Sequence, residues 1–160
     1  MIHRRSAAAV LVALLAALLL PACETYDTLI EKDQTCEQRW ADIEAQLQRR
    51  YDLIPNLVNI VKGSAKHEET VLKEVTEARS QAAAIKLTSD DLTDPEKMAA
   101  FQKAQDQLKG SLSRLMVVQE SYPDLKANAA FHDLQVQLEG TENRLLRARE
   151  QYNAAVKEFN

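Results

Sequence analysis

Apolar residues recur at alternating steps of three and four positions through each long segment of this chain. Because an α-helix turns once every 3.6 residues, this spacing gathers the apolar side chains into one stripe along a helix. The pattern is most regular near the carboxyl terminus, at Phe131, Leu134, Leu138, Thr141, Leu145, Ala148, Tyr152, Ala155 and Phe159. Such a stripe is buried only where other helices cover it, so the spacing predicts several helices packed together.

Three earlier segments carry the same pattern, and each predicts one further helix. One stripe contains Phe101, Ala104, Leu108, Leu112, Leu115, Val118 and Tyr122. The stripe nearest the amino terminus contains Cys36, Trp40, Ile43, Leu47 and Ile54, with Arg50 or Tyr51 between them. A broader stripe lies between these two and contains Leu57, Val61, Ala65, Val71, Leu72, Val75, Ala78, Ala82 and Ile85.

The composition supports an all-helical fold. The strong helix formers Ala, Leu, Gln, Glu, Lys and Arg dominate, whereas the runs of β-branched residues that mark strands are missing from the sequence. Only three Gly and four Pro are present, which leaves little room for long irregular segments. We therefore expect an all-α protein, an antiparallel bundle of about four long helices.

Proline and capping residues predict where these helices begin and end. The segment from Asp52 to Pro55 ends or kinks the first helix, so that the first two predicted helices are either separate or one long kinked helix. Asp94 is placed to cap the third helix, with Pro95 at its first position. Pro123 ends that helix, because the residue before a proline is pushed out of the helical region. Asn128 is placed to cap the last helix.

The first residues have the layout of a signal peptide. A short basic start is followed by an unbroken apolar run from Ala7 to Leu20, which is shorter than the roughly 20 residues that span a bilayer. Leu20-Pro21-Ala22-Cys23 then resembles the lipobox of bacterial lipoproteins, which implies that Cys23 carries fatty acids and becomes the new amino terminus. An uncleaved signal anchor is the alternative.

This layout predicts the organisation and the location of the protein. We expect a signal peptide at residues 1–22, a tether at 23–27 and one helical domain at 28–160. The mature chain would be held at the plasma or the outer membrane, facing away from the cytoplasm. Cleavage removes two arginines and takes the formal net charge from −4 to −6, which disfavours nucleic-acid binding. Other envelope proteins are the expected partners, and homo-oligomers stay open.

Cysteine and histidine do not predict a metal site or a cofactor. If Cys23 is acylated, Cys36 is left unpaired, and its place on an apolar stripe predicts a small buried side chain. The two cysteines and three histidines are scattered along the chain and lack the spacing of zinc ligands. His67, followed by two glutamates, has no second histidine at the spacing of a zinc-protease helix, so we interpret it as part of a solvated helix face.

Four ordered blocks of sequence resemble the LemA family: Arg49 to Val58, Val61 to Glu68, Tyr122 to Asn128, and Leu138 to Arg144. Together they cover the chain from about Trp40 to Asn160. The resemblance implies a membrane-tethered antiparallel bundle of long helices that faces away from the cytoplasm. It does not imply a biochemical activity, because the molecular role of the family is not established.

Two polar motifs inside these blocks are candidate interaction or structural sites. The longer motif interrupts the last apolar stripe and consists of Glu139, Gly140, Thr141, Glu142, Asn143 and Arg144. Glycine costs about 1 kcal/mol against alanine inside a helix, so a local reason for Gly140 is expected. Either Gly140 and Thr141 let another helix approach while Asn143 and Arg144 bond to it, or the motif forms a groove for a partner. Asn56 and Asn59 are expected to satisfy backbone groups beside the Pro55 break.

These observations favour a membrane-anchored, non-enzymatic scaffold or protein-interaction module of the cell envelope. One alternative is an enzyme, or an accessory subunit of one, with a polar pocket built around His67, Glu142 and Arg144. Another is a self-assembling coiled coil. Ionisable groups that converge in a concave site would favour an enzyme, and an exposed apolar patch would favour binding.

Overall fold

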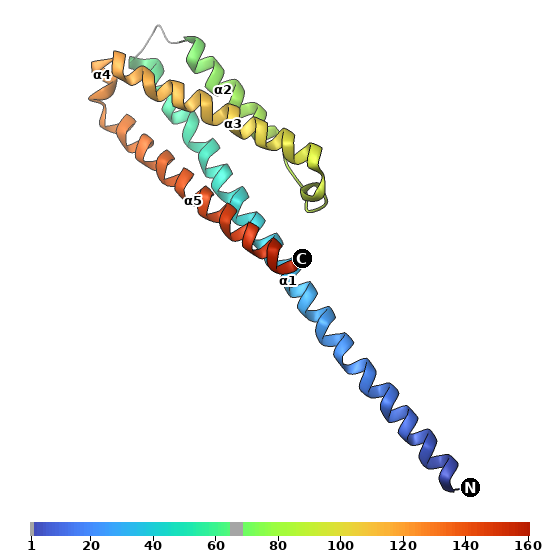
Figure 1. Cartoon of the computed structure of the whole chain (residues 1–160). Helices are drawn as coiled ribbons and strands as arrows, with labels where there is room; N and C mark the ends of the chain where they lie inside the picture. The colour runs from blue at the N-terminus through green and yellow to red at the C-terminus, as the bar shows by residue number, and fades with distance from the viewer. Residues whose placement is uncertain (1, 65–68) are drawn as a thin grey trace. The chain divides into compact units, whose positions relative to one another are not determined.

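The computed structural model describes the backbone of residues 2–64 and 69–160, and the side chains of residues 26–63 and 69–160. Five α-helices run in the order α1 (Ile2–Ser64), α2 (Glu69–Ala84), α3 (Pro95–Val118), α4 (Pro123–Lys126) and α5 (Ala129–Phe159) (Figure 1). Two 3-10 turns, η1 (Asp90–Thr93) and η2 (Gln119–Ser121), join them. The described residues contain no strand, so the all-α prediction is confirmed. None of their helices combines the length and the apolar character that crossing a membrane requires.

The chain divides into two compact units. The smaller unit comprises Met1–Ala41 and Arg149–Asn160, and the larger unit comprises Asp42–Ala148. In the smaller unit the end of α5 runs antiparallel to α1. The Trp40 and Tyr152 rings meet edge to face with centroids 5.5 Å apart, and Lys32 Nζ donates to the Glu158 carbonyl at 2.5 Å.

Cys36 differs from its prediction. It is a free thiol, as expected, but the side chain is only half-buried on α1. Burial raises the pKa of the thiol, and the carboxylates of Asp33 and Glu158 raise it further. The raised pKa keeps the Cys36 thiol protonated at neutral pH.

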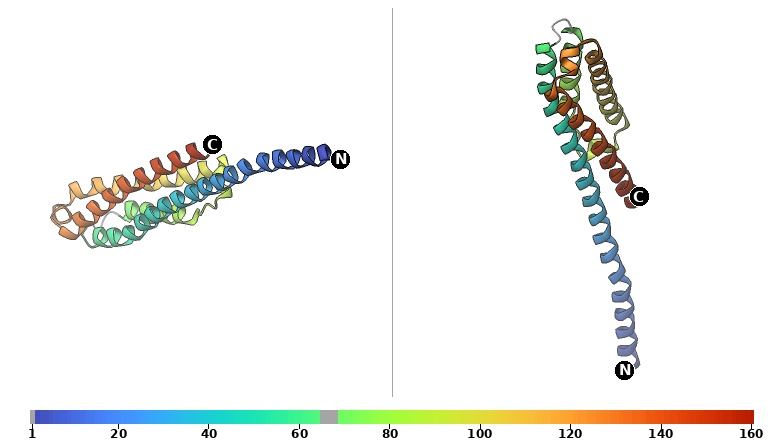
Figure 2. Two further views of the ribbon diagram at one scale, coloured as in Figure 1. Left: turned by 90° about the horizontal axis from the view of Figure 1, so that it is seen from below. Right: turned by 90° about the vertical axis from the view of Figure 1, so that its left-hand side faces the viewer.

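Four helical segments build the core of the larger unit: α1 beyond Asp42, α2, α3, and α5 up to Ala148 (Figure 2). The apolar stripes predicted from the sequence supply its side chains. Those almost fully buried include Ile54, Leu57, Val61, Val75, Leu108, Leu115 and Phe131. Burying a side chain of this size stabilises the fold by about 1.5–3 kcal/mol relative to leaving it in water.

Of the two alternatives at Pro55, the structure shows one long helix, because α1 continues through Pro55 to Ser64. The expected second helix is therefore divided: its first apolar positions belong to α1, and α2 begins only at Glu69. Ala65 lies outside the described residues. Pro55 has no N–H to donate to the carbonyl of Tyr51, one turn earlier. Arg79 of α2 replaces that bond, since its Nε donates to the Tyr51 carbonyl at 2.6 Å.

Two predicted caps are confirmed. Asp94 Oδ1 accepts from the backbone N–H of Glu96 at 2.9 Å and from that of Lys97 at 3.3 Å, and Pro95 occupies the first position of α3. Asn128 Oδ1 accepts from the backbone N–H of Phe131 at 3.1 Å at the start of α5. These bonds satisfy amides that have no partner inside the helix.

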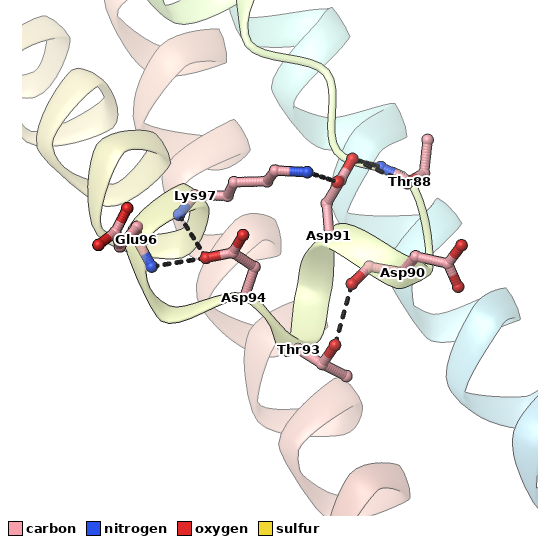
Figure 3. Close-up of polar contacts among 7 residues, drawn as sticks. All are labelled: Thr88, Asp90, Asp91, Thr93, Asp94, Glu96 and Lys97. Carbon is pink, nitrogen blue, oxygen red and sulfur yellow. Dashed lines mark hydrogen bonds and ion pairs between the residues drawn. The ribbon is translucent and has the colours of Figure 1, made fainter.

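The connection before α3 is held by one carboxylate (Figure 3). Asp91 Oδ2 accepts from the backbone N–H and the hydroxyl of Thr88, each at 2.8 Å, and Asp91 Oδ1 pairs with the Lys97 ammonium. The hydrogen bond from Lys97 and then the two from Thr88 hold the pKa of the Asp91 carboxyl well below its usual range.

This depressed pKa predicts a pH-dependent effect of Asp91→Asn. The carboxylate stabilises the folded state fully above the pKa of an unfolded aspartate, about 4, and loses that effect as pH falls towards the folded pKa. The difference in Tm between wild type and Asp91→Asn should therefore be largest near neutral pH and shrink below about pH 4. Asp90→Asn, whose carboxyl points away from this cluster in Figure 3, is the control. A difference that stays constant down to about pH 2 would contradict the assignment.

Candidate functional site

Two distant sequence blocks meet in a buried ion pair between α1 and α5. Arg50 Nη2 lies 2.8 Å from Glu142 Oε1, with 3% of the Arg50 side chain exposed and 37% of the Glu142 side chain. The sequence left open whether Arg50 or Tyr51 continues the apolar stripe of α1, and both are buried. A guanidinium at this depth depends on a carboxylate to offset its loss of water.

Tyr51 joins α1 to α2 and α3 beside this pair. Its hydroxyl donates to the Ala82 carbonyl at 3.2 Å and accepts from Gln105 Nε2 at 2.5 Å. Burial raises the pKa of the Tyr51 hydroxyl, while the hydrogen bond from Gln105 and the charge of Arg50 act in the opposite direction. The hydroxyl therefore stays neutral and works as a structural hydrogen-bonding group.

Arg144 makes a second polar link between α5 and α1. Its Nε donates to Gln46 Oε1 at 3.1 Å, and its Nη2 donates to Thr141 Oγ1 at 3.1 Å. The guanidinium lies back over Gly140, where an added Cβ would stand 3.4 Å from Arg144 Nη1. Apart from the surrounding helix backbone, the three heavy atoms nearest to that position all belong to Arg144. The expectation that Gly140 admits a neighbouring helix is therefore wrong: the space is filled by a side chain of its own helix.

This geometry predicts that Gly140→Ala is tolerated. A methyl group at 3.4 Å displaces only the flexible end of an exposed arginine, while alanine in a helix is favoured over glycine by up to about 1 kcal/mol. We expect the free energy of unfolding to rise by about 0.5–1 kcal/mol in chemical denaturation of the full chain. Gly110→Ala is the matched control, because nothing lies within 4 Å of its Cβ position. A clear loss of stability in Gly140→Ala alone would restore a packing role for this glycine.

The other residues of the longer motif divide between core and surface. Thr141 is fully buried, and its hydroxyl donates to the Gln137 carbonyl at 2.8 Å. Glu139 is exposed and accepts from Gln135 Nε2 at 3.2 Å, and Asn143 is exposed. The motif therefore has one buried member and several polar groups at the surface.

Asn56 and Asn59 do not take the role expected of them. Both are exposed on α1, and the carbonyl that Pro55 leaves unbonded is reached by Arg79 instead. His67 lies outside the described residues. Within the described ranges, His, Cys, Asp and Glu form no group of three or more that could hold a metal ion.

A small cavity opens beside the buried ion pair, between α3 and α5. It measures about 170 Å³ and is lined by residues of α1, α3 and α5. Arg50, Leu112 and Leu138 are its buried lining residues, whereas Lys109, Ser113 and Glu139 are exposed. Glu142 also lines it, but Arg144 is not among its lining residues. The structure therefore does not bring together the polar pocket expected from Glu142 and Arg144.

The sequence profile of one protein family, the LemA family, matches residues 39–160. This span contains both partners of the buried ion pair and the whole motif from Glu139 to Arg144. The chain belongs to the LemA family. No curated protein is similar enough to the chain to be counted as a relative.

Three residues of this LemA-family chain act at the site without having been singled out from the sequence. Gln46 accepts a hydrogen bond from Arg144, and Gln105 donates one to the Tyr51 hydroxyl. Arg79 donates to the Tyr51 carbonyl, opposite Pro55. Only Arg79 had a detectable signal. A proline inside an unbroken apolar stripe leaves one carbonyl without its helical donor, so a donor from elsewhere is required.

Proposed function

We propose that this LemA-family protein is a membrane-anchored, non-enzymatic scaffold that presents a helical bundle to other proteins of the bacterial envelope. The proposal rests on the ion pair and the hydrogen bond by which polar side chains connect the helices of the protein. Arg50 with Glu142, and Arg144 with Gln46, join α1 to α5. Polar groups that bond to each other in this way fix the helices in register, as a protein that displays a constant surface requires.

The part of α1 that follows Cys23 supports the membrane anchor. Tyr26, Leu29 and Ile30 are 65%, 48% and 39% exposed, and their spacing places them on one side of the helix. At 1.5 Å per residue they lie about 5–10 Å along the helix from Cys23. An aromatic and two aliphatic side chains at that distance from lipidated Cys23 would lie against the polar surface of the bilayer.

The anchor is tested on the native protein. Mass spectrometry should show a mature chain that begins at Cys23 and carries fatty acids, and Cys23→Ser should abolish this modification and either stay uncleaved or lose its anchor. Cys36→Ser is the matched control and should stay membrane-bound. A mature chain that begins at Met1 would rule out the lipoprotein and leave the signal anchor.

The scaffold role is tested by crosslinking in native membranes followed by purification of the full chain. We expect the wild type to recover a reproducible set of envelope proteins, and a Cys23→Ser chain that has lost its anchor to recover few of them. Recovery of no partner by the anchored wild type would contradict the scaffold role.

A further inference from the structure

We propose that α1 leaves the membrane at a slant, with the face that carries Tyr26, Leu29 and Ile30 in the headgroup layer of the bilayer and the opposite face in water. The inference rests on the proposed membrane anchor and adds to it a one-sided contact between α1 and lipid. Three features of the smaller unit point to this contact: the position of its exposed apolar side chains around α1, their distance from Cys23, and the charges beside them.

The exposed apolar side chains lie on one face of α1. Tyr26, Leu29 and Ile30 are the large apolar side chains that the smaller unit exposes among its described residues. At about 100° per residue, Leu29 and Ile30 lie within about 60° of Tyr26 around the helix, whereas Thr28 and Glu31 lie about 140–160° away and are also exposed. This turn of α1 is therefore apolar on one side and polar on the other, the pattern of a helix that lies in a membrane interface.

The distance from Cys23 requires α1 to lean. The headgroup layer on each side of a bilayer is about 5–8 Å thick. In an upright helix, Leu29 and Ile30 would stand about 9–11 Å above Cys23, at or beyond the outer edge of that layer. They enter the layer when α1 leans towards the face that carries them, and the same lean lifts the opposite, polar face away from the lipid. Asp33 lies on the apolar face about 15 Å from Cys23, so the stripe ends where α1 rises out of the layer.

Lipid fits this face better than a second copy of the chain. Three side chains offer far less than the roughly 800 Å² that each partner of a standard interface buries. Two copies anchored in one membrane would also be parallel, so a pair joined through this face would place the two Asp33 carboxylates together on the seam. The headgroup layer, by contrast, is held close to Tyr26 by the anchor at Cys23.

The charges beside the stripe favour lipid without net charge. Residues 26–33 contain three acidic side chains and one basic side chain, Lys32, which leaves a formal charge of −2. Lys32 reaches the end of α5, where it donates to the Glu158 carbonyl, and there the charges of Lys157 and Glu158 cancel. Anionic headgroups repel a surface of this charge, whereas a contact made by tyrosine and aliphatic side chains does not depend on them. The expected lipid is therefore zwitterionic, such as phosphatidylcholine or phosphatidylethanolamine.

Tryptophan fluorescence in brominated lipid tests the slant. The full chain, purified with its native anchor, is placed in vesicles of phosphatidylcholine brominated near the headgroup end of the acyl chains, where bromine quenches tryptophan on contact. Leu29→Trp should be quenched at least about threefold more strongly than Thr28→Trp, although position 28 is closer to Cys23. Both variants introduce the same side chain, so its own affinity for the interface cancels. Wild type gives the background from Trp40, which is 8% exposed and lies about 25 Å along α1 from Cys23.

A second variant removes the contact. Ile30→Glu in the Leu29→Trp protein should abolish most of the quenching difference, because it places a charge on the face that enters the lipid. Equal quenching of Leu29→Trp and Thr28→Trp, or quenching of Leu29→Trp that requires phosphatidylglycerol, would overturn the proposal. An unquenched Leu29→Trp would also overturn it, and a blue-shifted emission would then place a second copy of the chain on this face.

The outcome is separable from that of the proposed anchor. Residues 26–30 follow the segment held at the membrane whether Cys23 is lipidated or the signal anchor stays uncleaved. A chain that begins at Met1 and still shows the quenching difference keeps the slant and loses the lipoprotein. A lipidated chain with equal quenching at positions 28 and 29 keeps the anchor and loses the slant.

Discussion

Glu142→Ala should lower the free energy of unfolding of the full chain by about 2 kcal/mol, because it removes the half-exposed carboxylate that pairs with the buried Arg50 guanidinium. The guanidinium cannot escape by losing its proton, since arginine stays charged at every accessible pH. The measurement is chemical denaturation followed by the helical circular dichroism signal.

Glu139→Ala is the matched control for this prediction. Glu139 lines the same cavity three residues earlier on α5, but it is exposed and its partner is Gln135 of the same helix. Its removal should cost no more than about 0.5 kcal/mol. Equal effects of the two alanine variants would show that the ion pair is not what stabilises this contact.

A double variant separates the charge from the contact. Arg50→Met with Glu142→Leu removes both charges and keeps an apolar side chain on each helix, and replacing a buried pair in this way is often neutral or stabilising. We expect the double variant to recover most of the stability that Glu142→Ala loses. A double variant as unstable as the single one would mean that the pair has a further partner whose loss matters.

Arg79→Ala should cost about 2 kcal/mol, because the Tyr51 carbonyl opposite Pro55 then loses the donor that α2 supplies for it. The effect should depend on the proline. In a Pro55→Ala background the new backbone N–H can donate to the Tyr51 carbonyl, so Arg79→Ala should cost less than about 1 kcal/mol there. Denaturation of the four proteins of this cycle measures the coupling.

Arg114→Ala is the control for removing an arginine from the same unit. Its ion pair with Glu74 is exposed, so we expect a loss of about 0–1 kcal/mol whichever residue occupies position 55. If Arg79→Ala is equally costly with proline and with alanine at position 55, its role is packing of its aliphatic part rather than replacement of the missing bond.

The periodicity of the sequence was sufficient for the all-α class and for most of the core. Phe101, Leu108, Leu115, Phe131 and Leu145 are all buried where the stripes placed them. The caps at the starts of α3 and α5 were also predictable. Both features depend on residues within a few positions of one another, so local rules are enough to find them.

Local sequence rules were insufficient where a residue distant in the sequence supplies a missing hydrogen bond. A proline inside a helix removes one hydrogen bond, and the sequence near Pro55 contains nothing that replaces it. Arg79, whose Nε reaches the Tyr51 carbonyl, comes 28 positions after Tyr51, and its approach depends on how α2 packs against α1. A similar limit applies to Gly140, which could be explained only once the Arg144 side chain was seen to lie over it.

The sequence by itself determined which residues are apolar, where α3 and α5 start, and that Glu142 and Arg144 belong to a polar motif that needs an explanation. The tertiary structure alone decided what those charged residues contact. Gln46 and Arg144 are 98 positions apart, and they meet because α1 and α5 pack antiparallel in one particular register. A shift of either helix by one turn would keep every apolar stripe intact and change every polar partner. The apolar pattern repeats along a helix and tolerates such shifts, whereas a buried ion pair and a hydrogen bond are satisfied at a single register.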